Sequence, residues 1–160
     1  MFTGWAISVV TLSLVLAAAA PDAPRDPAPV PPIAATATIR APVKDVWRAW
    51  TTNEALQTWF AQRTQVELRR EGPFEIYFSL ESPEGSRGSE GCKIVSYLPE
   101  RMLSFTWNAP PKFAHARQER TWVVVLMSAS SPTETLVELH HLGWSEQIAA
   151  HPDHADEWRE

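Results

Sequence analysis

The fold is predicted by one stretch, Gly91-Cys-Lys-Ile-Val-Ser-Tyr-Leu-Pro-Glu-Arg-Met-Leu-Ser-Phe-Thr-Trp107, which indicates two strands joined by a tight turn at Pro99-Glu100-Arg101. On the first arm, positions 92, 94, 96 and 98 alternate with 93, 95 and 97. On the second arm, Leu103, Phe105 and Trp107 alternate with 102, 104 and 106. A period of two is typical of strands that bury one face. Proline has no N–H for a central ladder, so Pro99 belongs in the turn.

Two short helices are predicted between a short first strand over 35–39 and the next strand. The first helix is predicted to begin at Ala41-Pro42, because proline is favourable at the first helical position and an acidic residue, here Asp45, is favourable in the first turn. Apolar residues recur from Val43 to Trp50 at i, i+3, i+4 and i+7, which forms one buried stripe. Thr51-Thr-Asn-Glu54 fits a capping box that opens the second helix. Further strands are predicted over 64–68, 74–80, 121–127 and 135–141, and a C-terminal helix from 145, interrupted at 151–152.

The run from Thr121 to Met127 is nearly all apolar. This composition favours a central strand covered on both faces. Together with the hairpin, the runs indicate a predominantly antiparallel sheet.

Length and composition restrict the classes of protein that the chain can belong to. With 160 residues and 44% hydrophobic content, one globular domain is expected. A net charge of -5 argues against nucleic acid as a partner. Cys92 is the only cysteine, so an internal disulfide and a Cys-rich zinc site are excluded, and a small core residue is favoured over a reactive thiol.

Residues 1–20 carry no charged side chain and end in four alanines. This pattern is typical of a signal peptide, and we place cleavage between Ala19 and Ala20, which predicts a secreted or periplasmic protein. Retention of residues 1–20 as a membrane anchor is the alternative. Residues 20–33 hold six prolines and are expected to form a disordered spacer or a tether.

The residues that carry a family resemblance are Ile39-Arg-Ala-Pro42 with Val46-Trp47, Trp50-Thr51, Leu56 with Trp59-Phe60, Gly72-x-Phe74, Gly91 through Leu98-Pro99-x-Arg101, Leu103, Thr106-Trp107, Thr135, Val137, Leu139, His141 and Gly143. On these residues the chain resembles the START-like (SRPBCC) superfamily, in its AHSA1-like branch. The resemblance implies an α+β helix-grip domain over 34–160. Its antiparallel sheet would have about six to seven strands, with two short helices after strand 1 and a short C-terminal helix.

The chain departs from this family in two places. Glu71-Gly72 stands where the family usually has two glycines. Only nine residues follow His151, roughly 14 Å of helix, so the long helix with which relatives roof a central cavity is expected to be truncated. A sheet face carrying Phe78, Phe105 or Trp107 would then be partly uncovered.

The resemblance implies a cavity between sheet and helix that binds a small hydrophobic ligand, such as a lipid or an aromatic metabolite. For each aromatic candidate the alternative is ordinary core packing. For the histidine, the alternative is a core side chain bonded to a backbone carbonyl. The candidate cavity residues are Trp59, Phe60, Phe78, Phe105, Trp107, Trp122, His141 and Trp144.

Two other functions are compatible with the sequence. An enzyme of the cyclase or dehydratase kind would draw acid and base groups from His141, Tyr77, Glu75, Glu138 and Arg120, but no catalytic motif is present, so no catalytic residue and no cofactor is assigned. The other compatible function is protein interaction. The domain would then either act on a partner in the manner of a co-chaperone or form a homodimer through the uncovered sheet face.

Metal ligands are available only near the end of the chain. His151-Pro-Asp-His154 with Asp156, and His140 or His141, offer nitrogen and oxygen donors. Because an exposed polar helix start explains the residues from 151 to 156 without a metal, no metal site is predicted.

Overall fold

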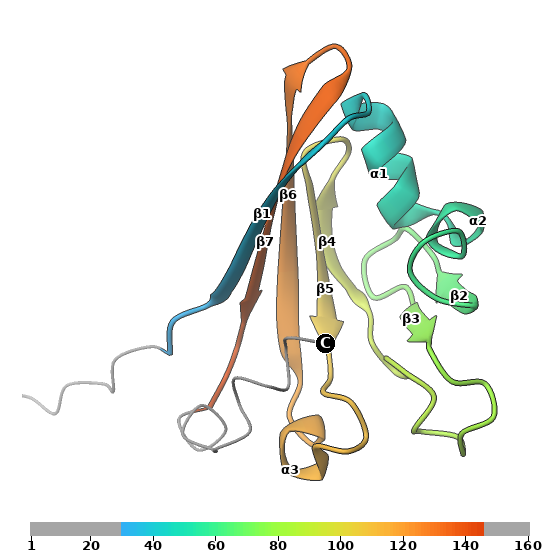
Figure 1. Ribbon diagram of the computed structural model, residues 1–160. Coiled ribbons are helices and arrows are strands. Elements are labelled where there is room, and N and C mark those ends of the chain that lie inside the picture. The colour runs from blue at the N-terminus through green and yellow to red at the C-terminus, as the bar shows by residue number, and fades with distance from the viewer. Residues whose placement is uncertain (1–29, 146–160) are drawn as a thin grey trace, which may run out of the picture.

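The computed structural model describes residues 30–145 (Figure 1). In chain order the elements are β1 (Ile33–Ile39), α1 (Val43–Thr51), α2 (Asn53–Leu56), β2 (Arg63–Val66), β3 (Phe74–Tyr77), β4 (Ile94–Leu98), β5 (Met102–Trp107), α3 (Ala114–Arg117), β6 (Thr121–Ser131) and β7 (Glu134–Leu142).

Five strands form one antiparallel sheet in the order β1-β7-β6-β5-β4, and β2 pairs with β3 in a second, two-stranded sheet. β1 closes the larger sheet by pairing with the last strand, with Ile33 opposite His141 and Ile39 opposite Thr135. An isolated bridge between Pro73 and Lys93 joins the two sheets next to β4. The α+β helix-grip class is therefore confirmed, with the predicted strands divided between two sheets.

The hairpin from β4 to β5 forms as predicted, with a turn in which Arg101 N–H donates to the Leu98 carbonyl at 3.0 Å. Its alternation is interrupted, because the register shifts between Ile94 and Ser96 at a β-bulge. Ile94 is buried, whereas Leu98, predicted on the same face, is 53% exposed. The prediction of one continuous buried face on this arm is wrong beyond the bulge.

The core lies on the side of the sheet that faces α1, α2 and the two-stranded sheet, which stand together at the right of Figure 1. From the sheet it contains Leu103, Phe105, Val123, Val125, Met127 and Val137, and from the covering elements Val46, Leu56, Phe74 and Ile76. We call the opposite side the outer face. There Trp122 is 43% exposed. The prediction that 121–127 is covered on both faces is therefore wrong for residues 30–145, because α1 and α2 lie on the core side and leave Trp122 and Leu126 exposed on the outer face.

The predicted exposure of the sheet face does not include Phe105, which is only 2% exposed, whereas Phe78 is 48% exposed. Trp50 of α1 and Phe74 of β3 contact the ring of Phe105. Those two elements cover this part of the sheet.

The joint between α1 and α2 differs by one residue from the predicted capping box. Thr52, not Thr51, is the N-cap of α2, and its hydroxyl accepts from Ala55 N–H at 3.4 Å. Thr51 ends α1 and its hydroxyl donates to the Trp47 carbonyl at 2.7 Å. Asn53 then fastens α2 to β2, since its side chain accepts from Val66 N–H at 2.8 Å and donates to Val66 O at 3.1 Å.

Several predictions fall outside the described residues. These are the signal peptide or anchor over 1–20, the spacer up to residue 29, the C-terminal helix, and the candidate ligands His151, His154 and Asp156. β1 begins at Ile33, so the first strand takes in the last residue of the predicted spacer. Within residues 30–145, no helix has the length and apolar character that a membrane span requires.

Candidate functional site

Seven aromatic side chains meet where α1, the segment after α2, β3 and β5 converge. We call Trp50, Trp59, Phe60, Phe74, Phe78, Phe105 and Trp107 the aromatic cluster. Phe74 stacks on Phe105 with ring centroids 3.9 Å apart, and Trp59 stacks on Phe60 at 4.9 Å. Phe60 and Trp107 also lie parallel, at 6.2 Å. Offset and edge-on ring pairs of this kind stabilise a core beyond the area they bury.

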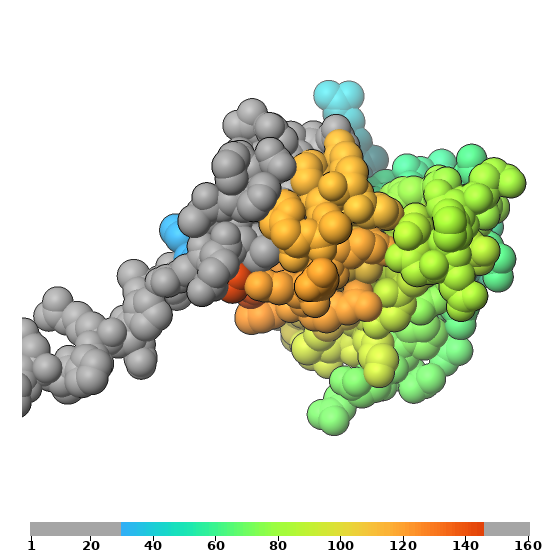
Figure 2. Space-filling view, turned by 90° about the horizontal axis from the view of Figure 1, so that it is seen from below, coloured from blue at the N-terminus to red at the C-terminus, as the bar shows by residue number. Residues whose placement is uncertain are grey.

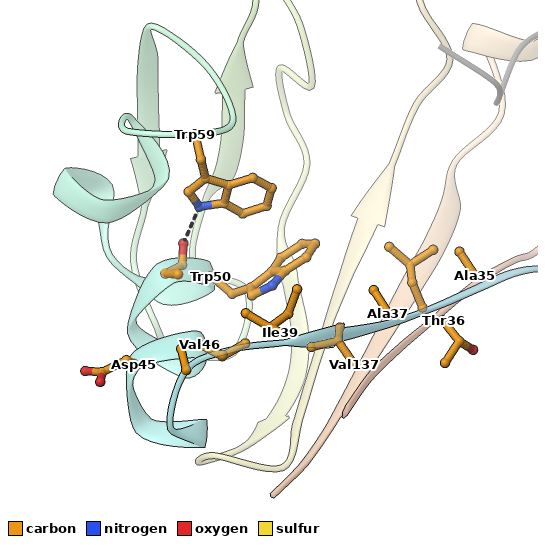
Figure 3. A pocket seen from close by; sticks show the side chains of 12 residues that line it. Ala35, Thr36, Ala37, Ile39, Asp45, Val46, Trp50, Trp59 and Val137 are labelled. Carbon is orange, nitrogen blue, oxygen red and sulfur yellow. Dashed lines mark hydrogen bonds between the residues drawn. The ribbon is translucent and has the colours of Figure 1, made fainter. Parts of the chain in front are cut away.

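On one side of the aromatic cluster, a groove of about 440 Å³ runs between α1 and the core face of β1 and β7 (Figure 3). We call it the sheet–helix groove. It is lined by Ala35, Thr36, Ala37, Ile39, Ala41, Asp45, Val46, Ala49, Trp50, Trp59, Val137 and Leu139. Nearly all of this lining is apolar. The groove is open because the edge strand presents alanines toward α1, and these do not reach the helix.

The orientation of Trp59 is set by one hydrogen bond. Its indole N–H donates to the Ala49 carbonyl at 3.1 Å, as Figure 3 shows. The polar atom of the ring is thereby satisfied within the protein, and 49% of the side chain remains exposed at the groove. In the same view the carboxylate of Asp45 points away from both tryptophans.

A second pocket, of about 480 Å³, lies between the loop after β3 and the loop after β5. We call it the loop pocket. Figure 2 looks onto this end of the molecule, where the lime-green residues near 80–90 lie beside the orange residues near 110–118. It is lined by Phe60, Phe78, Ser79, Ser82, Ser86, Arg87, Gly88, Ser89, Trp107, Asn108, Ala109, Pro110, Pro111 and Arg117.

Arg117 holds the two loops together. Its guanidinium donates to Ala109 O at 2.5 Å on one loop, and to Gly85 O at 2.7 Å and Gly88 O at 2.9 Å on the other. The carboxylate of Glu90 lies 3.7 Å away. Burial lowers the pKa of Arg117, and Glu90 opposes this change. The side chain remains cationic, because arginine is always protonated in proteins.

The structure brings five of the eight predicted cavity residues into the aromatic cluster, but it does not place all eight in one cavity. Trp59 lines the sheet–helix groove, and Phe60, Phe78 and Trp107 line the loop pocket. Phe105 is buried between them. Trp122 lies on the outer face, so its prediction as a cavity residue is corrected by the parity of β6.

His141 and Trp144 form a separate contact away from both pockets. His141 Nε2 lies 2.7 Å from Thr121 Oγ1, and the two rings have centroids 4.5 Å apart. The Trp144 indole donates to the His141 carbonyl at 3.2 Å. His141 faces the core side as predicted, but it lines neither pocket.

The five acid–base candidates do not converge either. Tyr77 O–H donates to Glu75 at 2.5 Å, and burial, followed by this bond, raises the pKa of Tyr77 to about 12. Glu138 is on the outer face, opposite Leu126, and Arg120 donates to Glu90 O at 3.2 Å. A proton-transfer group works best with a pKa near the operating pH, so Tyr77 is poorly suited to this role. Residues 30–145 contain no cluster of three or more metal-ligating side chains.

Sequence reasoning missed three kinds of site residue. Trp50 and Phe74 were assigned to helix and strand faces but not to the aromatic cluster. The positions of Ala35 and Ala37 on one face of β1 are visible in the sequence, since small residues recur there with a period of two. Alanine has no functional group, however, so this pattern does not indicate a binding site. Asn108 gave no signal, because asparagine beside prolines is typical of any exposed loop.

The burial of Cys92 can be tested by the reactivity of its thiol. Its side chain is fully buried, and burial raises the pKa of the thiol from 9.0 to about 11. We expect no reaction of the native protein with a disulfide reagent at pH 8, and reaction of one thiol after unfolding in urea. The folded state binds more protons than the unfolded state between these two pKa values. The free energy of unfolding should therefore fall as the pH rises from about 9 to about 11.

The control is Cys92→Ala. In this variant, the decrease in the free energy of unfolding that the thiol causes between about pH 9 and pH 11 should disappear. Rapid labelling of the native protein at pH 8 would contradict the expectation.

An antiparallel sheet packed against short helices, with an apolar groove between them, defines a START-like helix-grip domain. Within this class, the chain belongs to the family described as activator of Hsp90 ATPase homolog 1-like protein, whose model matches residues 40–160. The resemblance inferred from the sequence is thereby confirmed.

Solved structures agree with this assignment. A protein from Mesorhizobium loti is 21% identical, with a TM-score of 0.58 over 78% of this chain and 81% of that one. An Hsp90 activator from Plasmodium falciparum is 14% identical, with a TM-score of 0.56 over 72% of this chain and 75% of that one. The Aha1 dimer from Colwellia psychrerythraea is 18% identical, with a TM-score of 0.55 over 78% of this chain and 83% of that one. At these identities the likeness shows the fold alone. No curated protein matches the chain.

Proposed function

We propose that this domain binds a small hydrophobic ligand in the sheet–helix groove. The observation that carries the proposal is the groove itself, which combines a volume of about 440 Å³ with an almost wholly apolar lining. Small-molecule sites in proteins have volumes of roughly 300–1,000 Å³ and linings of this kind. Burial of apolar ligand surface there would provide the driving force.

The shape of the groove indicates how the ligand lies. Trp50 and Trp59 meet edge to face at 5.1 Å and form its aromatic end. Ala35 and Ala37 leave room along β1 for an acyl chain or a flat ring. Asp45 points away from the rings and lies 3.7 Å from Arg48, so the groove provides no charge toward its apolar floor. A polar end of the ligand would therefore remain in solvent at the rim.

Replacement of Ala37 by phenylalanine should fill the groove and lower the affinity for a neutral fluorescent probe, 1-N-phenylnaphthylamine, at least tenfold. The physical reason is steric, because an added ring at Ala37 occupies the space between β1 and α1. Probe fluorescence gives the dissociation constant, and native mass spectrometry of the full chain identifies any ligand that copurifies.

The matched control is Thr38→Phe, which places the same ring on the opposite side of the same strand, since successive side chains alternate. It should bind the probe within twofold of the wild-type affinity. Equal affinities in Ala37→Phe and the wild type would exclude the groove as the ligand site.

A second candidate function, association with another protein, is favoured by the outer face. Leu98, Met102 and Leu126 are cross-strand neighbours there, and Trp122 is paired with Leu142. Leu98, Trp122 and Leu126 are exposed. Exposed apolar patches of this kind mark interaction sites. The neighbours include a dimer and an Hsp90 activator, so self-association through this patch is the form we propose.

Leu126→Lys should abolish self-association by placing a charge in the centre of this patch. Sedimentation velocity at 10–100 μM (on the order of a weak dimer's Kd) should show a dimer for the wild-type chain and a monomer for the variant. Thr38→Lys, on the outer face at the sheet edge opposite Leu136, is the control and should leave the dimer intact. A wild-type monomer over the whole range would remove this candidate.

A further inference from the structure

The loop pocket has an aromatic wall and a polar wall. Phe60, Phe78 and Trp107 form the first; Phe60 packs edge to face on Phe78 at 5.6 Å and lies parallel to Trp107 at 6.2 Å. Serines, Asn108 and two arginines form the second. The sheet–helix groove has no comparable polar side, so the two pockets differ in the chemistry that they offer.

Asn108 is the unusual residue of the polar wall. The residue is only 5% exposed as a whole, but its side-chain amide is not sealed from solvent, and no other residue of the described part of the chain forms a hydrogen bond with it. An unpaired amide that lines a pocket is placed to bind a polar group of a ligand.

The charge of the pocket lining is positive. Arg87 and Arg117 line it, and no carboxylate does so among the described lining residues. Arg117 is committed to the loop carbonyls and to Glu90. Arg87 uses its Nε to donate to Ser82 O at 2.9 Å, which leaves its terminal nitrogens without a bond to any residue of the described part of the chain. These nitrogens can donate to an anion in the geometry that carboxylates prefer.

The pocket is also held in shape before any ligand arrives. Ser89 Oγ accepts from Ile76 N–H at 2.8 Å and donates to Phe74 O at 3.2 Å, and Glu90 accepts from the backbone of Gly85 and Arg87. A preformed site loses less conformational entropy on binding.

From these observations we propose that the loop pocket binds a small aromatic carboxylate. The ring lies against Phe60, Phe78 and Trp107, and the carboxylate accepts hydrogen bonds from the amide of Asn108 and the guanidinium of Arg87. The site is distinct from the sheet–helix groove, although Trp59 of the groove and Phe60 of the pocket stack on each other.

The test uses naphthalene-2-carboxylate as the probe, with its neutral carboxamide as the comparison, and isothermal titration calorimetry on the full chain. The wild-type protein should bind the carboxylate at least tenfold more tightly than the carboxamide. Asn108→Leu should lower carboxylate affinity at least tenfold and leave the melting temperature close to the wild-type value, because the amide forms no hydrogen bond with the described part of the protein. Arg87→Gln should abolish the preference for the carboxylate, because it removes the guanidinium. The backbone N–H of residue 87 can still donate to Glu90, so the loop should keep its shape.

Three results would overturn the proposal. They are equal affinity for the two probes, affinities in both variants within twofold of the wild-type value, and unfolding of Asn108→Leu, which would show that the amide is structural. Ala37→Phe separates this site from the groove: it should leave carboxylate binding unchanged whether or not the groove binds a ligand of its own.

Discussion

Replacement of Phe105 by alanine is expected to lower the free energy of unfolding by about 3–5 kcal/mol. The side chain is 2% exposed, and its ring stacks on Phe74 and lies within 5.9 Å of Trp107 and 6.4 Å of Trp50, measured between centroids. The change leaves a cavity at the point where β5, β3 and α1 meet. This loss is a large fraction of the roughly 5–15 kcal/mol by which domains of this size are stable. Urea unfolding followed by circular dichroism measures the loss.

Phe78→Ala is the matched control, because it removes the same atoms from the same aromatic cluster at a side chain that is 48% exposed. Its cost should be about 1 kcal/mol or less, since much of the ring is already in water. Equal losses in the two variants would show that burial in the cluster does not control stability.

The fold could be predicted from local patterns because most elements have their signal within a few residues. The turn at Pro99 and the period of two in β5 are both visible in the sequence. The bulge between Ile94 and Ser96 is not visible, because it depends on how β4 pairs with β5 and not on the composition of β4. For this reason Leu98 was assigned to the wrong face.

The aromatic part of the site was predictable for a similar reason. Strand parity brings Phe105 and Trp107 to the core face, and the segment after α2 brings Trp59 and Phe60 to meet them. Strand parity could not assign Trp122 to either face of the sheet, because β6 is apolar at nearly every position from 121 to 127 and no polar residue marks its outer face.

The pockets themselves could not be predicted, because each depends on space that side chains do not fill. The sheet–helix groove exists since Ala35 and Ala37 are too small to reach α1. The loop pocket depends on Arg117, which is distant in sequence from the glycine carbonyls that it joins. Neither a short side chain nor a long-range bond to a carbonyl has a sequence pattern of its own.

Gly88→Ala is expected to lower the free energy of unfolding by about 3 kcal/mol or more, because overpacking against backbone has no cheap relief. A Cβ at this position would lie 1.8 Å from the carbonyl oxygen of Ile76 and 2.9 Å from its carbonyl carbon. The backbone there cannot easily move, since Gly88 bridges to Tyr77 and its carbonyl accepts from Arg117. The variant should therefore also lose binding at the loop pocket. Thermal unfolding and titration with naphthalene-2-carboxylate measure the two effects.

Gly85→Ala in the same loop is the control that separates steric contact from backbone conformation. Gly85 has a φ of +82°, in the region that favours glycine, but a Cβ there would meet nothing within 4 Å. Its replacement should cost only the strain of a left-handed residue, about 1–2 kcal/mol. If the carbonyl of Ile76 controls the loop, Gly88→Ala must be the more damaging change although its φ is ordinary. The reverse order would mean that conformational strain, and not close packing on β3, limits the loop.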